Sequence, residues 1–399
     1  MSFITCYFED EFLEHFHPLT LTRPLHDLRV GILTLGEKWE YTLNNNNSVK
    51  GTIRPELKGV FPEQKPVSDN ETVLWINPRY LPTENLLKQI RSLKSGEGIH
   101  CDDHLIVANV EAAVHNTWLK TGINLDQVTL LEVDQTGLQN VWQLFQWNGQ
   151  EIRQDLKRIP SLKVANSKDY PYSSLVNSDQ IFIEDGAIIE PGAILIAESG
   201  PIYIGKGARL MANSVVRGSA AICEKSVVKM GAKIYEDTTI GPVCKVGGEV
   251  SNVIFHSYSN KAHDGYAGNS VFGQWCNIGA DTNTSNLKNN YGTVKFRDWA
   301  TGKELDTGQQ FIGTIMGDHS KTGINAMLST GTLCGVCCNL FSDGYPPKFV
   351  PSFSWVSGKD LVPYHFDKAI EAMEKMMKRR NVELTPAYRN MMETILESS

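Results

Sequence analysis

The second half of the chain carries an aliphatic residue at every sixth position. Counting from residue 204, eight such residues follow in phase: Ile204, Leu210, Val216, Ile222, Val228, Ile234, Ile240 and Val246. The residues four places further on are nearly all small: Ala208, Ser214, Ala220, Ser226, Ala232, Thr238, Cys244 and Val250. A period of six is neither the 3.6 of an α-helix nor the two of a strand. It fits a coil with three short sides, and therefore predicts a left-handed parallel β-helix from about residue 181 to about residue 335.

The six-residue period also extends beyond this run, with shifts of phase. It appears at Ile183 and Ile189, and returns at Phe272, Ile278, Met316, Thr322, Leu328 and Cys334. It breaks at residues 197–201, 247–262 and 283–310. We expect these breaks to be loops extruded from a rigid solenoid, and such loops are a common place for catalytic and binding residues.

The first 170 residues read as mixed α/β. Short β-rich runs predict strands at 72–76 (TVLWI) and 104–110 (HLIVANV), and apolar residues at helical spacing predict helices at 84–93 and 142–155. We therefore expect an α/β domain over residues 1–170.

The polar stretch 166–179, which contains Pro171, is the expected linker to the solenoid domain of residues 171–350. Residues 367–396 have helical spacing and are divided by Pro386. The chain is thus expected to end in a helical segment over 351–399.

Composition narrows the function classes. The net charge of −7 gives no global field that would recruit nucleic acid or an anionic membrane. No apolar run approaches a membrane span, and the first residues are acidic where a signal peptide is basic. Eight cysteines in 399 residues do not make a disulfide framework. Cys334 falls on an inward repeat position, so the C-x-x-C-C cluster that it opens is read as structural. We expect a cytoplasmic protein.

Two polar segments stand out at the later breaks. Residues 260–269 read NKAHDGYAGN, and residues 277–288 read NIGADTNTSNLK. They resemble, in order and separation, the K-A-G-H-x-x-Y-x-G and N-x-G-A-G-T segments of the bifunctional enzymes that make UDP-N-acetylglucosamine. These enzymes join a glucosamine-1-phosphate acetyltransferase to an N-acetylglucosamine-1-phosphate uridyltransferase. More broadly, the chain resembles a variant branch of these proteins known from Bacteroidetes, the sugar nucleotidyltransferases.

The resemblance implies that His263 is a general base for acetyl transfer from acetyl-CoA. Chemistry gives a separate reason to single it out, because a sugar amine is largely protonated at neutral pH and histidine is well matched to accepting its proton. The resemblance also implies that a small sugar phosphate is the partner and that the protein is a homotrimer. The remaining implied contacts are Tyr266 and Asn277 to the sugar, Asn286 to the amine, the backbone at Ala280 to the acetyl group, and Lys245 and Lys288 to phosphate.

Some positions depart from the family pattern. The glycine that precedes the family's histidine is missing, since Ala262 is followed directly by His263. Asp281 stands in place of a second glycine, and the family's Asn-Tyr pair is Asn286-Leu287 here. These departures concern the acceptor sugar more than the acyl chemistry.

The family's nucleotidyltransferase domain binds a nucleoside triphosphate and Mg²⁺, using a glycine-rich loop and nearby cations. The corresponding stretch 19–39 lacks the glycine run but offers Arg23, Arg29 and Lys38 as nucleotide-binding cations. Where the family has a metal-binding Asp after a strand, residues 77–79 read Asn-Pro-Arg, so no metal ligand is identified. The alternative is that Arg23 and Arg29 form internal salt bridges in a domain that does not catalyse.

The leading hypothesis is therefore a CoA-dependent N-acetyltransferase of an amino sugar phosphate, fused to a nucleotidyltransferase-like domain. Its rival is a non-catalytic trimeric scaffold or sugar-nucleotide-binding protein. A third interpretation is a metal-dependent solenoid enzyme, which needs three converging histidines. His256, His263 and His319 exist, but their spacing does not match that pattern.

Overall fold

The computed structural model describes residues 4–45, 49–358 and 360–398. The chain divides into two compact units. The first comprises residues 1–13, 23–28 and 33–139, and the second comprises residues 14–22, 29–32 and 140–399. This division differs from the expected boundary at residue 170, because the helix after residue 140 and two short N-terminal segments group with the solenoid.

The first unit is built on a five-stranded mixed sheet in the order β1-β2-β4-β3-β5. Its strands are β1 (Ile4–Tyr7), β2 (Thr72–Ile76), β3 (Glu97–Cys101), β4 (His104–Glu111) and β5 (Thr129–Glu132). β1 runs parallel to β2, and β5 runs parallel to β3, whereas β4 is antiparallel to both of its neighbours. The strands predicted at 72–76 and 104–110 are confirmed.

Helices cover both faces of this sheet. The helices are α1 (Leu35–Thr42), α2 (Glu84–Ser92) and α3 (Ala112–Thr121). Trp39 of α1 and Ile90 of α2 share one buried cluster with Leu74, while Trp118 of α3 packs in another with Trp75. Alternate residues of β2 thus point to opposite faces, as strand geometry requires. The unit is an α/β domain, as predicted.

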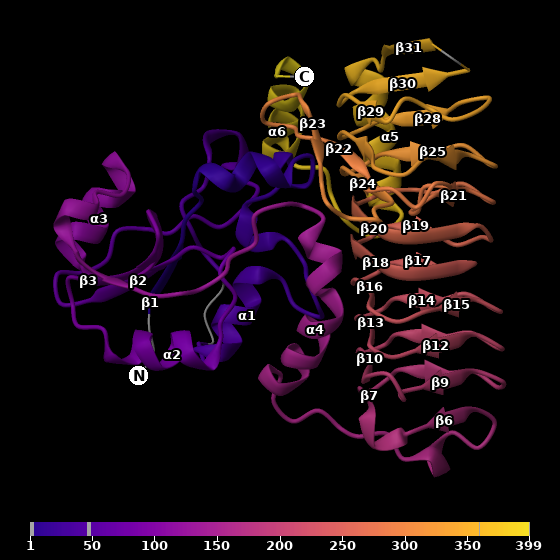
Figure 1. Ribbon diagram of the computed structural model, residues 1–399, viewed down its shortest axis with the longest axis horizontal. Helices are drawn as coiled ribbons and strands as arrows, with labels where there is room; N and C mark the ends of the chain where they lie inside the picture. The colour runs from indigo at the N-terminus through magenta and orange to yellow at the C-terminus, as the bar shows by residue number, and fades with distance from the viewer. Residues whose placement is uncertain (1–3, 46–48, 359, 399) are drawn as a thin grey trace. The chain divides into compact units, whose positions relative to one another are not determined.

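The second unit is a parallel β-solenoid of the left-handed β-helix kind, whose coils stack along one axis (Figure 1). One side consists of β8 (Ile188–Ile189), β11 (Arg209–Leu210), β14 (Val227–Val228), β17 (Lys245–Val246), β19 (Asn260–Lys261), β25 (Lys321–Thr322), β28 (Asn339–Phe341) and β30 (Ser354–Ser357), with β31 (Asp360–Pro363) antiparallel at its end. The second side consists of β6 (Ser174–Val176), β9 (Ile194–Ile196), β12 (Val215–Arg217), β15 (Lys233–Ile234), β21 (Asn283–Thr284) and β26 (Met327–Leu328). The third consists of β7 (Ile181–Ile183), β10 (Ile202–Ile204), β13 (Ala220–Ile222), β16 (Thr238–Ile240), β24 (Thr314–Met316), β27 (Thr332–Cys334) and β29 (Phe349–Val350).

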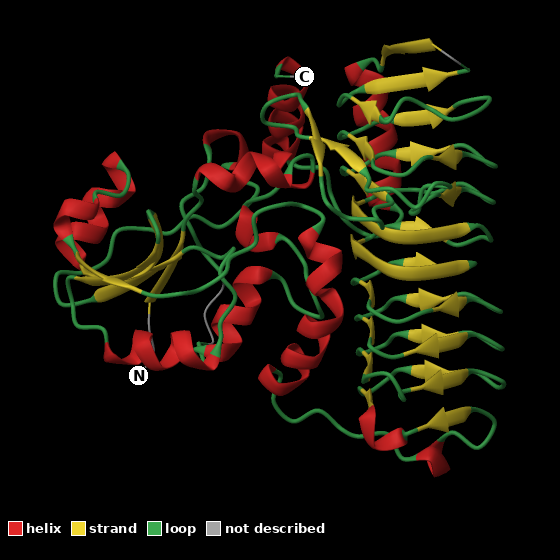
Figure 2. Cartoon of the chain, viewed as in Figure 1, coloured by secondary structure: helices red, strands yellow, loops and turns green. Residues whose placement is uncertain are grey.

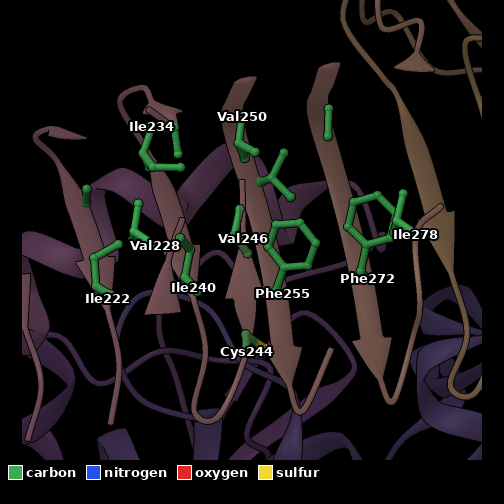
Figure 3. Packing of buried hydrophobic residues seen from close by; sticks show 14 of the residues in the cluster. Ile222, Val228, Ile234, Ile240, Cys244, Val246, Val250, Phe255, Phe272 and Ile278 are labelled. Atoms are coloured by element: carbon green, nitrogen blue, oxygen red, sulfur yellow. The ribbon is translucent and has the colours of Figure 1, made fainter. Parts of the chain in front are cut away.

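The register confirms the six-residue period. Ile204 pairs with Ile222, which pairs with Ile240, so a regular coil takes eighteen residues. All eight aliphatic residues of the repeat are buried in one core, which Figure 3 shows from Ile222 to Ile278. The solenoid also extends past the predicted limits, because β6 lies inside the expected linker and β28 to β31 follow residue 335.

The three breaks have different structures. The first adds three residues to a coil, since Ile183 pairs with Ile204 twenty-one residues later. The third adds a long excursion between Phe272 and its partner Met316, which contains a hairpin of β22 (Lys295–Arg297) and β23 (Glu304–Asp306). The second break is no extruded loop, and the expectation was wrong there.

The second break is a shortened coil, because Val246 pairs with Lys261 only fifteen residues later. Its flanking strands β18 (Glu249–Ser257) and β20 (Tyr266–Gln274) each run for nine residues across two sides of the solenoid. They are the longest strands of the stack (Figure 2).

Helix α4 (Gln143–Arg158), predicted at 142–155, packs along the solenoid and holds residues 29–32 against it. The amide of Gly31 donates to Oδ1 of Asn148 at 2.7 Å, and the Thr239 hydroxyl of β16 donates to the Gly31 carbonyl at 3.0 Å. The amide of Ile32 donates to Oδ2 of Asp155 at 2.8 Å. These bonds explain why an N-terminal segment belongs to the solenoid unit.

The chain ends in two helices, α5 (Phe366–Lys378) and α6 (Pro386–Glu397), as predicted. Pro386 occupies the first turn of α6, where its missing N–H costs nothing, and Thr385 caps that helix by accepting from the amide of Tyr388. None of the helices in the described part of the chain has both the length and the apolar character needed to cross a bilayer.

Candidate functional site

The shortened coil creates a hollow at one corner of the solenoid. Neighbouring corners between the first and second sides have four residues, as between β14 and β15, but only Gly247 and Gly248 link β17 to β18. A Cβ at Gly247 would lie 2.6 Å from the Ala262 carbonyl oxygen, and Gly248 has a φ of +70°. Only glycine fits this path. The missing side chains leave a hollow of about 460 Å³.

His263 stands at the rim of this hollow. It is the second residue of the four-residue corner that links β19 to β20, and its side chain is exposed. This corner has the regular length of four residues, with Ala262 directly before His263. Within the described residues, no hydrogen bond or ion pair engages the His263 ring. Both ring nitrogens are thus available to a ligand.

The rest of the hollow combines apolar and charged groups. Met230, whose side chain is 63% exposed, and Lys229 line it from the coil on one side, and Ala280 and Asp281 line it from the other. Asn260 and Asn277 form a parallel bridge between neighbouring coils. His263 lies three residues after Asn260 and Ala280 lies three residues after Asn277, so the two residues align. Ala280 therefore lies beside His263, on the neighbouring coil.

Tyr266 and Asn286 form a direct pair. Nδ2 of Asn286 donates to the Tyr266 hydroxyl at 3.2 Å and to Oδ1 of Asn269 at 2.6 Å. Burial raises the pKa of the Tyr266 phenol, so this group remains a neutral hydroxyl at physiological pH. Lys288 is engaged elsewhere, since its ammonium donates to the Thr293 carbonyl at 2.5 Å at the base of the excursion.

Asn277 and Lys245 lie on the outward face of the first side. The register places Lys245, Asn260, Asn277 and Lys321 in one column, and Oδ1 of Asn277 accepts from Nδ2 of Asn260 at 2.9 Å. Neither Asn277 nor Lys245 lines the hollow beside His263.

Lys245 and three neighbouring cations form a cluster of four positive charges. Burial lowers the pKa of Lys245, and the nearby charges of Arg380, Lys229 and Arg379 lower it further. None of the four forms a salt bridge within the described residues. Lys229 also lines the hollow. Arg379 and Arg380 directly follow α5 in the sequence, and only the fold brings them to Lys245.

Lys261 is a residue of this region whose role the sequence did not reveal. It occupies an inward core position after Val246, although its side chain is charged. The shortened coil moves the six-residue count by three places, so counting from Val246 does not reach it. Counting backward by six from Ile278 reaches Asn260 instead, because that coil has seventeen residues, so the six-residue pattern does not reach Lys261 from either side.

The three nucleotide-binding candidates are buried. In the first unit, Arg23 is 1% exposed and pairs with Asp27 at 3.2 Å, and Lys38 lies fully buried in α1. In the solenoid unit, Nε of Arg29 donates to the His256 carbonyl at 3.2 Å, and its guanidinium also donates to the Ile32 carbonyl. None of the three side chains is open to solvent.

A Mg²⁺ ion does not fit the donor set after β2. Arg79 stands where the resemblance led us to expect a metal carboxylate, and its Nε lies 2.5 Å from Oδ2 of Asp10. Nδ2 of Asn77 donates to the same oxygen at 2.7 Å. Asp10, Glu11 and His104 do cluster, but Nδ1 of His104 already contacts Glu11 at 2.7 Å. A divalent ion would have to displace a buried guanidinium from Asp10.

No set of three histidines converges in the described ranges, where the only potential metal cluster is that of Asp10, Glu11 and His104. His256 and His319 are buried, and Nε2 of His319 lies 2.7 Å from the Tyr388 hydroxyl. The metal-dependent interpretation therefore lacks its ligand set.

Comparisons with known proteins agree with the architecture. Residues 5–163 match the family model described as sugar nucleotidyl transferase. The bifunctional protein GlmU of Rippkaea orientalis is 27% identical over 174 residues, covering 39% of this chain and 34% of the relative. The bifunctional sugar-1-phosphate nucleotidylyltransferase/acetyltransferase of Sulfurisphaera tokodaii is 30% identical over 129 residues, covering 32% and 28%.

Among solved structures, the UDP-N-acetylglucosamine acyltransferase of Campylobacter jejuni aligns with 57% of this chain and 95% of its own, at 13% identity and a TM-score of 0.24. The chain spans less than half the length of the curated relatives described above. The resemblance seen in the motifs is nevertheless confirmed: this chain is related to the bifunctional sugar-1-phosphate nucleotidylyltransferase/acetyltransferases, and its residues 5–163 match the sugar nucleotidyl transferase family.

Proposed function

We propose that the protein is a CoA-dependent N-acetyltransferase that acts on an amino sugar phosphate. The observation that carries the proposal is the exposed, unpaired imidazole of His263 at the rim of the hollow left by the shortened coil. A histidine that is only a solvated surface residue does not require the neighbouring corner to be two residues shorter than the others. A base that must meet a substrate amine does need that open space.

In the proposed reaction the substrate amine attacks the thioester carbonyl of acetyl-CoA. His263 accepts the proton that the nitrogen loses as the N–C bond forms. The C–S bond then breaks, and the proton passes from His263 to the departing thiolate, which yields the amide and free CoA. Tyr266, kept neutral by burial, is suited to donate a hydrogen bond to a sugar hydroxyl.

The four-cation cluster supports a phosphorylated ligand. Lys229, Lys245, Arg379 and Arg380 repel one another, and this repulsion is relieved when a polyanion binds among them. Both reactants of the proposed reaction carry phosphate. Because Lys229 also lines the hollow, the cluster would hold such a ligand beside His263.

We also propose that the protein assembles as a homotrimer. The hollow is open to solvent in the single chain, and Met230 is a large exposed apolar side chain at its rim. A neighbouring subunit would close the site and exclude water from it.

For the first unit, the ion pair of Arg79 and Asp10 favours a role in binding a sugar nucleotide, or a structural role, over metal-dependent nucleotidyl transfer. The unit would then retain the family's fold as a sugar-nucleotide-binding or structural domain.

The decisive experiment is a screen for CoA release from acetyl-CoA across amino sugar phosphates, followed by His263→Ala. Loss of the base should lower kcat by about 10²–10⁴-fold, with little change in Tm because the exposed ring supports no core contact. KM for acetyl-CoA should hold, since the base meets the amine.

The matched control is His365→Ala, which changes another exposed histidine, at the start of α5, whose side chain makes no capping bond. It should keep wild-type activity. If His263→Ala retained most of its activity, the catalytic proposal would fail, and the non-catalytic scaffold would become the better description.

A further inference from the structure

Lys261 occupies a position that the repeat reserves for aliphatic residues. It pairs with Val246 in the strand ladder, and the bridge between Asn260 and Asn277 aligns it with Ile278. Val246 and Ile278 both point into the core in Figure 3. The Lys261 side chain is only 1% exposed. Burying an ammonium group is costly unless its donors are satisfied, so such a residue calls for a specific reason.

The ammonium of Lys261 is held by backbone carbonyls. Nζ donates to Gly247 at 3.1 Å, to His263 at 3.0 Å and, more weakly, to Asp264 at 3.5 Å. Its three protons thus meet three acceptors. Burial lowers the pKa of Lys261 to about 8, against the opposing pull of the Asp264 and Asp281 carboxylates.

These bonds join the two segments that form the hollow. Gly247 belongs to the shortened coil, and His263 and Asp264 belong to the corner that carries the proposed base. An aliphatic residue, as found at Val246 and Ile278, would fill the core and leave all three carbonyls without this donor.

We propose that Lys261 is a positioning residue for His263: from inside the core, its ammonium ties the His263 corner to the shortened coil and so fixes the imidazole over the hollow. Lys261 itself does not reach substrate, because its side chain is buried and does not line the hollow. The inference rests on the proposed function, since it gives His263 the role of base.

The test is Lys261→Met, which keeps an unbranched side chain of similar length and removes all three donors. In the CoA-release assay, kcat should fall roughly 10–100-fold, the scale expected when a reacting group is misplaced by about 1 Å. KM for acetyl-CoA should be unchanged. Lys261→Gln retains an amide donor, so its kcat should lie between those of the wild type and Lys261→Met. If Lys261→Met does not fold, Lys261→Gln replaces it in the test.

Two further measurements separate this inference from the proposed function. In a His263→Ala background, Lys261→Met should cause no further loss, because a residue that acts through His263 has nothing left to position. An equal loss in both backgrounds would overturn the inference. Amide hydrogen exchange at residues 262–265 should be faster in Lys261→Met than in the wild type, whatever the activity of His263→Ala. If the exchange rates in Lys261→Met equalled those of the wild type, the inference would also be overturned.

Discussion

The solenoid core offers a matched pair of substitutions on adjacent residues of β14. Val228 is fully buried and lies in the ladder between Leu210 and Val246. Val227 points outward, between Arg209 and Lys245. Replacing each in turn by Asp changes the same atoms on opposite faces of one strand.

The expected cost differs widely between the two. At position 228, the loss of a buried valine costs roughly 1.5–3 kcal/mol. Burying a carboxyl group without a partner adds about 1–3 kcal/mol even when it takes up a proton. The sum, about 2.5–6 kcal/mol, is a large part of a typical stability of about 5–15 kcal/mol. At position 227, a surface change is expected to stay within about 0.5 kcal/mol, and Arg209 and Lys245 attract the new carboxylate.

The measurement is urea unfolding at pH 7, followed by circular dichroism in the far ultraviolet. Val228→Asp should unfold at a much lower urea concentration than the wild type, or fail to accumulate as folded protein, while Val227→Asp should match the wild type. Equal midpoints for the two variants, or a lower midpoint for Val227→Asp, would show that the assigned inward face is wrong.

Three other predictions concern the chemistry and the assembly. The pKa of Lys261 falls from 10.5 to about 8 on folding, so between these pH values the unfolded chain binds more protons and stability rises with pH. In urea unfolding, the stability of the wild type relative to Lys261→Met should therefore increase by up to roughly 3 kcal/mol between pH 7.5 and 10.5. A stability difference between the two proteins that stays constant over this pH range would contradict the buried charge. Pyrophosphate exchange with a nucleoside triphosphate, a sugar-1-phosphate and magnesium should be absent in the wild type, since Arg79 occupies the metal position; exchange that Arg23→Ala abolishes would restore the nucleotidyltransferase hypothesis. Light scattering at micromolar concentration should give three times the chain mass of 44.5 kDa, and a monomer mass would count against a site shared between subunits.

The sequence predicted the solenoid well because its coils obey a local rule. Each inward residue, such as Ile222 or Val228, follows six positions after the last, and the core confirms that phase on both sides of every break. The breaks themselves were harder to interpret. An insertion and a deletion both interrupt a period, so the sequence pattern alone does not distinguish the shortened coil before Lys261 from an extruded loop, whereas the strand register does.

The site was predictable only in part, because some of its residues meet through the fold. His263 and Ala280 share a corner column at a separation of seventeen residues, which a motif can reveal. Arg380 approaches Lys245 from a helical segment more than a hundred residues away, and no local pattern encodes that approach. In the first unit, the resemblance suggested exposed cations. The sequence could not show that Arg23 and Lys38 are buried, since their burial depends on tertiary packing.

The tolerance of different coil lengths also means that the solenoid can be lengthened or shortened by whole coils. Coils of fifteen, seventeen, eighteen and twenty-one residues all keep their strand ladders, so these differences in length are absorbed at the corners. Duplicating the eighteen residues that begin at Ile202 should therefore preserve the stack and move the hollow about 4.8 Å further from its first coil, the spacing of neighbouring strands. Within such an architecture, distance along the axis can be varied in fixed steps without redesigning the site that the axis carries.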